Sequence, residues 1–226
     1  MNTYRMRSTK NTFVALVLAS VSGAFAASSA TAFAQGAPVL NIADARARVA
    51  VEREIAQAAS RGLPVRSLIA KAHEGVTKRA TGERIRVAVA SQARRLEQAR
   101  DLLAPSLSEA ELIAGADALA VGVPAPMLRQ VRAAYPAHQS VAMPLDVMTE
   151  LVARGVPAKH ALEQITNLMR RGATPTQIAL LGASVQSDIA AGLTPDAALE
   201  VRARGVMSLL PSPANAAALA PSGPRP

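Results

Sequence analysis

A short phrase recurs along this chain and marks places where one helix stops and another starts. It consists of a glycine, an apolar residue and a proline, with a threonine before the proline in two cases. Glycine readily adopts the left-handed conformation just past a helix end, and the apolar residue after it can pack back on the last turn. Proline cannot continue the old helix but fits the first turn of the next one. Each phrase therefore predicts a tight link between two helices. The five phrases are Gly62-Leu63-Pro64, Gly122-Val123-Pro124, Gly155-Val156-Pro157, Gly172-Ala173-Thr174-Pro175 and Gly192-Leu193-Thr194-Pro195.

The segments between these links predict nine helices and an all-α fold. Thr174 with Gln177, and Ser108 with Glu111, have the spacing of a capping box at a helix N-terminus. The glycines at the expected helix ends are 13 residues apart from Gly62 to Gly75 and 33 from Gly122 to Gly155. The spacings are then 17 to Gly172, 20 to Gly192 and 13 to Gly205. This spacing is too irregular for a regular repeat array, so we expect a compact bundle of short helical hairpins. The expected helices are 41–60, 64–74, 82–103, 109–121, 125–135, 144–154, 157–171, 175–191 and 195–204.

One segment has a competing interpretation as a β-strand. Residues 84–89 alternate polar and apolar side chains and include two β-branched valines. The longer set Ile85, Val89, Gln92, Leu96, Ala99 and Leu103 instead follows spacings of three and four, which is a helical period. No second strand is predicted to pair with this segment, so we interpret it as helix.

The first thirty-four residues have the organisation of a secretory signal peptide. A basic start precedes an apolar run, and a small-x-small site follows. Interruption by Ser20, Ser22 and Gly23 leaves the run shorter than the roughly twenty residues of a membrane-spanning helix, although an uncleaved anchor is the alternative. We expect cleavage after Ala34, or else after Ala26, and a periplasmic or secreted protein. The elements of the signal are Arg5, Arg7, Lys10, Phe13 to Ala19 and Ala32-Phe33-Ala34.

The exported chain, Gln35 to Pro226, is long enough for one domain with a hydrophobic core. It keeps one aromatic residue, Tyr135, and the chain has no cysteine, so the core must be aliphatic and without disulfides. Its charge is 22 basic minus 16 acidic residues, or +6. Because arginine greatly outnumbers lysine, as GC-rich codons produce, and because the protein is exported, we do not expect a nucleic-acid partner. The predicted domains are 1–34 signal peptide, 35–204 helical domain and 205–226 tail.

The predicted tail is proline-broken and rich in small residues. It contains Pro211, Pro213, Pro221, Pro224 and Pro226. This composition is typical of a flexible segment. Its beginning, which holds Val206, Met207, Leu209 and Leu210, has the alternative of docking on the helices as a short turn.

The helix expected over 82–103 carries the densest basic cluster and is a candidate binding surface for anions. Acidic residues sit among the arginines, and such neighbours usually form a solvated, mutually paired helix face. We therefore prefer a charged exposed face, and keep attachment to anionic lipid or polysaccharide as the alternative. The candidate residues are Arg84, Arg86, Arg94 and Arg95, with Arg100 nearby.

The three histidines are the candidates for metal or acid-base chemistry. His73 is expected in the last turn of its helix, where a cation is mildly favoured. His160 has Glu163 one turn on, but zinc needs at least three protein ligands, and no further cluster of ligand residues is apparent. We therefore expect no metal and no cofactor.

The connection Tyr135-Pro136-Ala137-His138-Gln139-Ser140 is the chemically richest link between helices. It combines Tyr135, His138 and Ser140, and loops often carry function. A serine near a histidine in sequence is not by itself a nucleophile with its base, and no nucleophile elbow is present. We interpret the connection as a linker, and keep a hydrolase or metal-enzyme site there as an alternative.

The sequence is consistent with three functional hypotheses. The leading one is a non-enzymatic interaction or scaffolding protein of the bacterial envelope, with another exported protein as its partner. The second is peripheral binding to an anionic envelope surface through the arginine-bearing helix. The third is an enzyme centred on Tyr135, His138 and Ser140 or on His160 and Glu163. The glycine, apolar and proline links occur in many unrelated helical proteins and identify no family.

Overall fold

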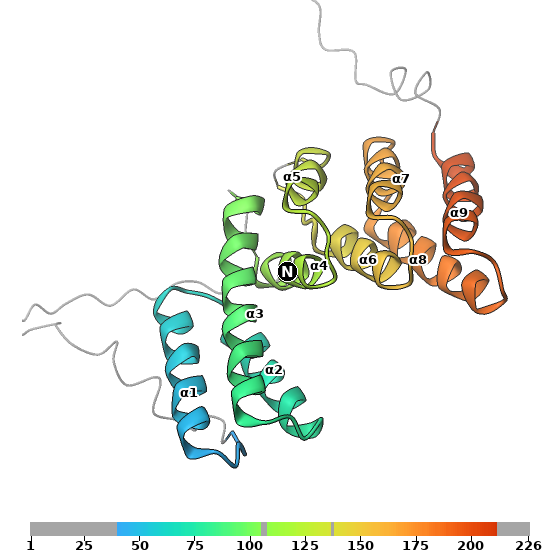
Figure 1. Ribbon diagram of the computed structural model, residues 1–226. Coiled ribbons are helices and arrows are strands. Elements are labelled where there is room, and N and C mark those ends of the chain that lie inside the picture. Colours follow the sequence, from blue (N-terminus) through green and yellow to red (C-terminus); the bar gives the residue numbers. More distant parts are fainter. Residues whose placement is uncertain (1–39, 105–107, 137, 212–226) are drawn as a thin grey trace, which may run out of the picture. The chain divides into compact units, whose positions relative to one another are not determined.

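The computed structural model describes residues 40–104, 108–136 and 138–211, and these residues are all-helical, as predicted (Figure 1). The predicted signal peptide and residues 212–226 of the predicted tail lie outside the described residues. No helix of the described part has the length and hydrophobicity that crossing a bilayer requires. The described helices are α1 (Ala45–Ser60), α2 (Val65–Thr77), α3 (Gly82–Leu103), α4 (Glu109–Ala120), α5 (Ala125–Ala133), α6 (Ala142–Ala153), α7 (Ala158–Arg170), α8 (Pro175–Ala190) and α9 (Pro195–Leu209).

The segment that alternates like a strand is part of α3. Thr81 caps this helix by accepting a hydrogen bond from the Arg84 backbone N–H. The positions of the helical period, Ile85, Val89 and Leu96 among them, are buried along one side of it. The helical interpretation is therefore confirmed, because burial follows the period of three and four rather than that of two.

The glycine links form helix C-terminal motifs of one kind. All five glycines have positive φ, between 70° and 102°. At the first link, the Gly62 N–H donates to the Ala59 carbonyl (2.9 Å) and the Leu63 N–H donates to the Ala58 carbonyl (3.0 Å), and the same pair of bonds closes the other four. The apolar residue after glycine is buried at four links and exposed at Leu193. The predicted tight links are thus confirmed, and only the last one leaves its apolar residue in solvent.

The end of α2 differs from the prediction. We expected the helix to stop before Gly75, but it continues to Thr77, so His73 lies one turn before the end. Gly75 is inside the helix because α3 packs against it: a Cβ there would lie 2.7 Å from the Ile85 Cγ1. The helix ends instead with Arg79 in the left-handed region, at φ 52°, the conformation that glycine has at the five glycine links.

Replacing Arg79 with glycine should therefore stabilise the protein. A non-glycine residue in the left-handed conformation costs about 1–2 kcal/mol, and part of this gain is offset by the greater freedom of glycine in the unfolded chain. We expect the free energy of unfolding to rise by about 0.5–1 kcal/mol. The same exchange at Arg66, an exposed right-handed position of α2, should lower it by about 1 kcal/mol. Urea denaturation of the two variants measures the difference, and equal effects would contradict this explanation.

Helices α1, α2 and α3 pack on one another around their own core. This core includes Val51, Ala58, Leu68, Val89 and Leu96. The second core runs through α4 to α9 and also takes in the C-terminal residues of α3. Both α3 and α4 contribute to both cores, α4 through Leu112 and Ala116 on one side and Ala114 and Ala118 on the other.

The α3–α4 contact that joins the cores is close because of a glycine. A Cβ at Gly115 of α4 would lie 2.8 Å from the Leu103 Cδ1 and 3.0 Å from the Ala99 Cβ of α3. Contacts this short leave no room for a side chain. At Gly115 the backbone of α4 therefore lies directly against the side chains of Leu103 and Ala99 on α3.

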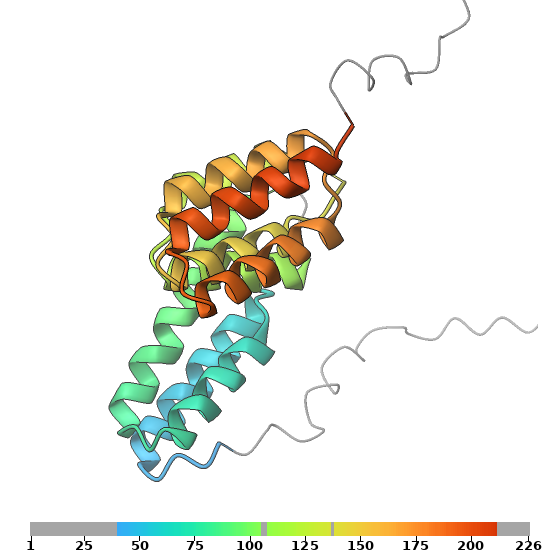
Figure 2. The same ribbon diagram turned by 90° about the vertical axis from the view of Figure 1, so that its right-hand side faces the viewer.

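Helices α4 to α9 form three hairpins in two layers. The first helices of the hairpins, α4, α6 and α8, lie side by side, and so do the second helices, α5, α7 and α9 (Figures 1 and 2). The links inside the hairpins carry Gly122, Gly155 and Gly192, which are 33 and 37 residues apart. The predicted helical hairpins are confirmed. The glycines are nearly evenly spaced when only the links inside the hairpins are compared, and the links between hairpins are left out.

Helix α9 is longer than expected, because it runs to Leu209 and not to 204. Leu210 is buried in the second core, and Val206 and Met207 pack partly against it. Beyond the helix, an Arg171 Nη2 donates to the Pro211 carbonyl (3.2 Å). The start of the predicted tail therefore docks on the helices, in a longer form than the short turn considered from the sequence.

Candidate functional site

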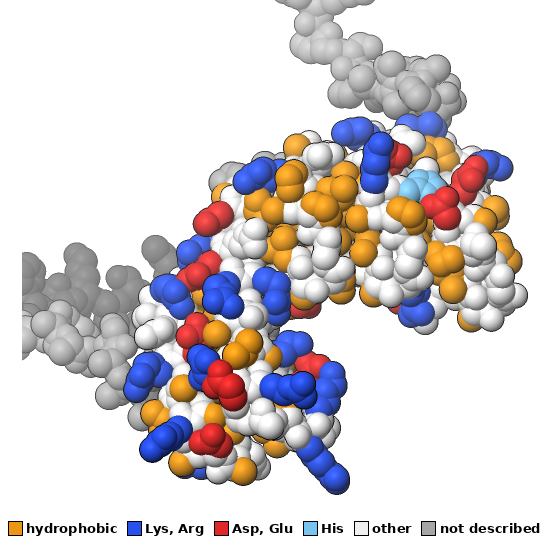
Figure 3. All heavy atoms as spheres, viewed as in Figure 1, with side chains coloured by type: hydrophobic (Ala, Val, Ile, Leu, Met, Phe, Trp, Pro, Cys, Tyr) orange, Lys and Arg blue, Asp and Glu red, His pale blue; other side chains and the backbone are white. Residues whose placement is uncertain are grey.

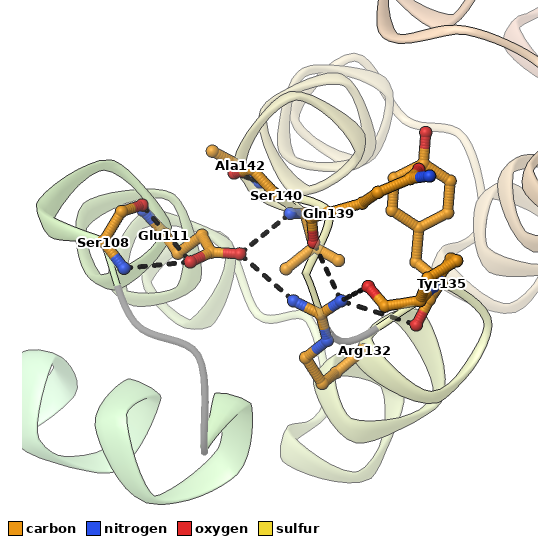
Figure 4. Close-up of polar contacts among 9 residues, drawn as sticks. Ser108, Glu111, Arg132, Tyr135, Gln139, Ser140 and Ala142 are labelled. Atoms are coloured by element: carbon orange, nitrogen blue, oxygen red, sulfur yellow. Dashed lines mark hydrogen bonds and ion pairs between the residues drawn. The ribbon is translucent and has the colours of Figure 1, made fainter.

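A buried ion pair lies under the connection between α5 and α6, the richest link in the sequence. Glu111 in the first turn of α4 is 2% exposed and Arg132 near the end of α5 is 8% exposed. The Arg132 Nη1 donates to the Glu111 Oε1 at 3.2 Å (Figure 4). Two charges buried together are costly unless further hydrogen bonds satisfy them.

Further hydrogen bonds surround both partners. The Glu111 Oε2 accepts from the backbone N–H of Ser108 (2.9 Å) and from its hydroxyl (3.2 Å). The Ser108 Oγ accepts in turn from the Glu111 backbone N–H (3.2 Å), which completes the predicted capping box. The Glu111 Oε1 also accepts from the buried N–H of Val141, at the N-terminus of α6 (2.9 Å). The carboxylate therefore ties the start of α4 to the start of α6.

Arg132 holds the rest of the connection through its other terminal nitrogen. The Arg132 Nη2 donates to the carbonyls of Pro136 (2.7 Å) and Gln139 (2.9 Å), and to that of Tyr135 (3.4 Å) (Figure 4). Three backbone carbonyls thus converge on one guanidinium. The buried guanidinium thus holds the described residues on both sides of Ala137, and the Gln139 N–H also donates to the Pro136 carbonyl (2.9 Å).

The pKa of Glu111 is lowered from its ordinary value of 4.5. Burial raises the pKa, but the hydrogen bonds from Ser108 and Val141 and the charge of Arg132 outweigh burial. Glu111 is therefore ionised at neutral pH, as the ion pair requires.

Above this network lies a cleft of about 560 Å³, which we call the α5–α6 cleft. One wall is the α5–α6 connection, and the other is the end of α7 together with its link to α8. Tyr135 supplies a phenol, Gln139 an amide and Arg170 a guanidinium, while Met169 adds an apolar surface. Such a combination can bind a polypeptide segment with mixed apolar and polar side chains. The lining residues are Ala134, Tyr135, Pro136, Gln139, Met169, Arg170, Gly172, Ala173, Thr174 and Pro175.

The structure does not gather the three candidate residues of the connection into one site. Tyr135 lines the cleft, whereas His138 and Ser140 are exposed and are not among its lining residues. The Ser140 hydroxyl accepts a hydrogen bond from the Ala142 N–H (3.2 Å), at the start of α6. The serine therefore has a local structural role.

The arginines of α3 lie on a face where charges of both signs are mixed (Figure 3). Arg86 makes two hydrogen bonds to Glu83, at 2.5 and 2.9 Å. Arg95 donates to the buried Gln92 (2.8 Å), and Arg94 donates to the Ser91 hydroxyl (3.2 Å). Arg84 is exposed, beside a smaller hollow that Lys71 and Lys78 also line. Several cluster members thus have partners on their own helix, as in a solvated face.

The two remaining histidine candidates lie on different helices, His73 on α2 and His160 on α7. His160 of α7 contacts Asp196 of α9, with 2.5 Å between Nδ1 and Oδ1, and Gln164 lies 3.2 Å from its Nε2. Glu163 instead faces Lys159 at 3.9 Å. Among residues 40–104, 108–136 and 138–211, no three potential metal ligands of the His, Cys, Asp or Glu type come together. His160 therefore joins two helices.

Sequence reasoning missed the role of Glu111 and Arg132. Glu111 was recognised only as a capping residue, and Arg132 was not considered. A signal was present: Arg132 follows Leu128 by four residues and Val131 by one, so it lies on the buried side of α5. An arginine and a glutamate on apolar helix faces suggest a buried pair, but only the fold shows that the two faces meet.

No protein-family model matches the chain, and no curated protein and no solved structure matches it either. Its function is therefore inferred from the contacts of its own residues.

Proposed function

We propose that this chain is an exported, non-enzymatic interaction or scaffolding protein of the bacterial envelope. Its partner is another exported protein, which it contacts at the α5–α6 cleft. The observation that carries the proposal is the fixing of the α5–α6 connection by the buried pair of Glu111 and Arg132. A buried ion pair adds little net stability, so we infer that this one serves to impose a single conformation on the connection.

A fixed connection favours binding because less conformational freedom is lost when the partner arrives. The side chains it presents also suit protein recognition. Tyrosine and arginine are enriched among the residues that dominate the energetics of protein interfaces, and the cleft contains Tyr135 and Arg170. The partner segment should be extended, with an apolar side chain for Tyr135 and Met169 and an acceptor or carboxylate for Arg170.

The enzyme alternative has less support from the geometry. An acyl-transfer site needs a nucleophile whose hydroxyl is free to react and a base oriented toward it. His138 and Ser140 are exposed and do not line the cleft, and His160 instead contacts Asp196 of α9 and Gln164 of its own helix. The candidate nucleophile and base are therefore not gathered in the cleft.

Site-specific photocrosslinking in intact cells tests the proposal. A photoreactive amino acid in place of Tyr135 should form an adduct with one exported protein, because Tyr135 lines the cleft. The same amino acid in place of Val87, which is 46% exposed on α3, is the matched control and should form no such adduct. Adding Arg170→Glu to the Tyr135 probe should abolish the adduct. Retention of the chain in the cytoplasm, equal adducts at both positions, or turnover of a small substrate by the purified protein would contradict the proposal.

A further inference from the structure

The last hairpin has one side that no described helix covers. Helices α8 and α9 pack against α6 and α7 on one side, and Figure 2 shows their opposite side facing outward. Three large apolar side chains project from it: Leu180 is 59% exposed, Val201 53% and Leu209 78%. A groove of about 340 Å³ runs between the two helices. We call this surface the end face, defined by Gln177, Leu180, Ser184, Val201, Gly205 and Leu209.

A glycine forms a notch in the middle of the end face. Gly205 lies inside α9, where glycine is less favourable than alanine. A Cβ at this position would meet nothing within 4 Å among the described residues. Val201, Gly205 and Leu209 follow one another at spacings of four, so the bare backbone lies between two exposed apolar side chains. This arrangement can receive an apolar side chain from outside.

The charges beside the end face neutralise one another. Arg202 makes two hydrogen bonds of 2.6 Å to Asp188, and Arg204 contacts Glu200 at 2.7 Å. The hydrogen bond from Arg202 lowers the pKa of Asp188, so this pair persists at neutral pH. In a chain with a formal net charge of +9, a neutral and apolar surface is one on which two copies can meet without repulsion.

We infer that the end face pairs with the same face of a second copy of this chain, related by a twofold axis. Leu180 of one copy packs into the notch over Gly205 of the other, and the reverse contact follows from the symmetry. The contact extends the side-by-side packing of hairpins already present between α6–α7 and α8–α9. It is independent of the α5–α6 cleft and of the partner proposed there.

The size of the end face sets the expected affinity. Sixteen residues of α8 span about 24 Å, and two helices of about 10 Å diameter give a face of roughly 500 Å² per copy. The total of about 1,000 Å² is at the low end for specific interfaces. We therefore expect reversible dimers that dissociate in the micromolar range.

Sedimentation velocity of the purified protein over a concentration series, from about 1 to 100 μM around that expected dissociation range, measures the association. We expect a monomer–dimer equilibrium in the wild type. Leu180→Arg should weaken it at least tenfold, because two buried arginines would lack partners. Val87→Arg, an exposed apolar position on α3, is the matched control and should leave it unchanged. Circular dichroism checks that both variants are folded.

A second measurement does not depend on a disruptive substitution. Since the chain has no cysteine, Ser184→Cys introduces a single thiol on the end face, and Val87→Cys introduces one elsewhere. Under mild oxidation the first variant should form a disulfide-linked dimer much faster than the second. A wild type that stays monomeric throughout the series, a Leu180→Arg variant that dimerises like the wild type, or equal oxidation of the two cysteine variants would overturn the inference.

Discussion

Replacing Glu111 with glutamine will lower the free energy of unfolding by about 3–5 kcal/mol, the cost of breaking a buried ion pair from one side. The substitution keeps the shape of the side chain but removes its charge. Arg132, which is 8% exposed, then remains as a buried cation without a counter-ion. The amide also cannot accept all the hydrogen bonds that reach the carboxylate from Ser108, Val141 and Arg132.

Urea denaturation monitored by circular dichroism measures this loss, and Glu109→Gln is the matched control. Glu109 is in the same turn of α4 but is exposed, so its replacement should change stability by no more than about 0.5 kcal/mol. The pKa of Glu111 is lowered in the folded state, so its stabilising effect is present above its ordinary pKa of 4.5 and is lost as the pH falls through the folded-state value. The difference between wild type and Glu111→Gln should therefore shrink in acid. Equal stability of the two glutamine variants at neutral pH would contradict a structural role for the pair.

Replacing Gly115 with valine should destabilise the protein by about 3 kcal/mol, at the upper end of the cost of overpacking a core. Even the first carbon of a new side chain would lie within 2.8–3.0 Å of Leu103 and Ala99 on α3. The valine methyl groups must then push α4 away from α3. Because both cores include residues of these two helices, the displacement affects both.

Ala120→Val at the exposed end of α4 is the matched control for this substitution. It introduces the same β-branched side chain into the same helix, and costs only the difference in helix propensity, about 0.5 kcal/mol. Thermal unfolding of both variants separates the steric effect from the propensity. If the two midpoints fell equally, the close approach at Gly115 would not be the cause.

The sequence was sufficient for the helices and their links because those signals are local. A glycine followed by an apolar residue and proline specifies a helix end from a few neighbouring residues. The same locality explains the error at α2: Gly75 looks like a helix end in sequence, but its lack of a side chain serves the packing of Ile85 from α3. Arg79 gives no such signal, because arginine rarely adopts the left-handed conformation.

The candidate site could be predicted only in part, because it depends on contacts between distant residues. The α5–α6 connection was recognised from its composition, and Tyr135 does line a cleft there. The other wall of the cleft comes from the end of α7, with Arg170, and from the link to α8, with Thr174. Glu111 and Val141 are thirty residues apart and are joined by one hydrogen bond. No local pattern predicts such a meeting.

The sharing of α3 and α4 between two hydrophobic cores has a consequence for how the molecule loses its structure. If α1 and α2 detached, the N-terminal turns of α3, with Ile85 and Val89, would be stripped of their apolar neighbours, and Leu112 and Ala116 of α4 would face water with them. The hairpins α6–α7 and α8–α9 would then be attached to a helix pair, α3 and α4, that is half solvated. Melting should consequently be a single cooperative event across both cores, although each has its own set of side chains.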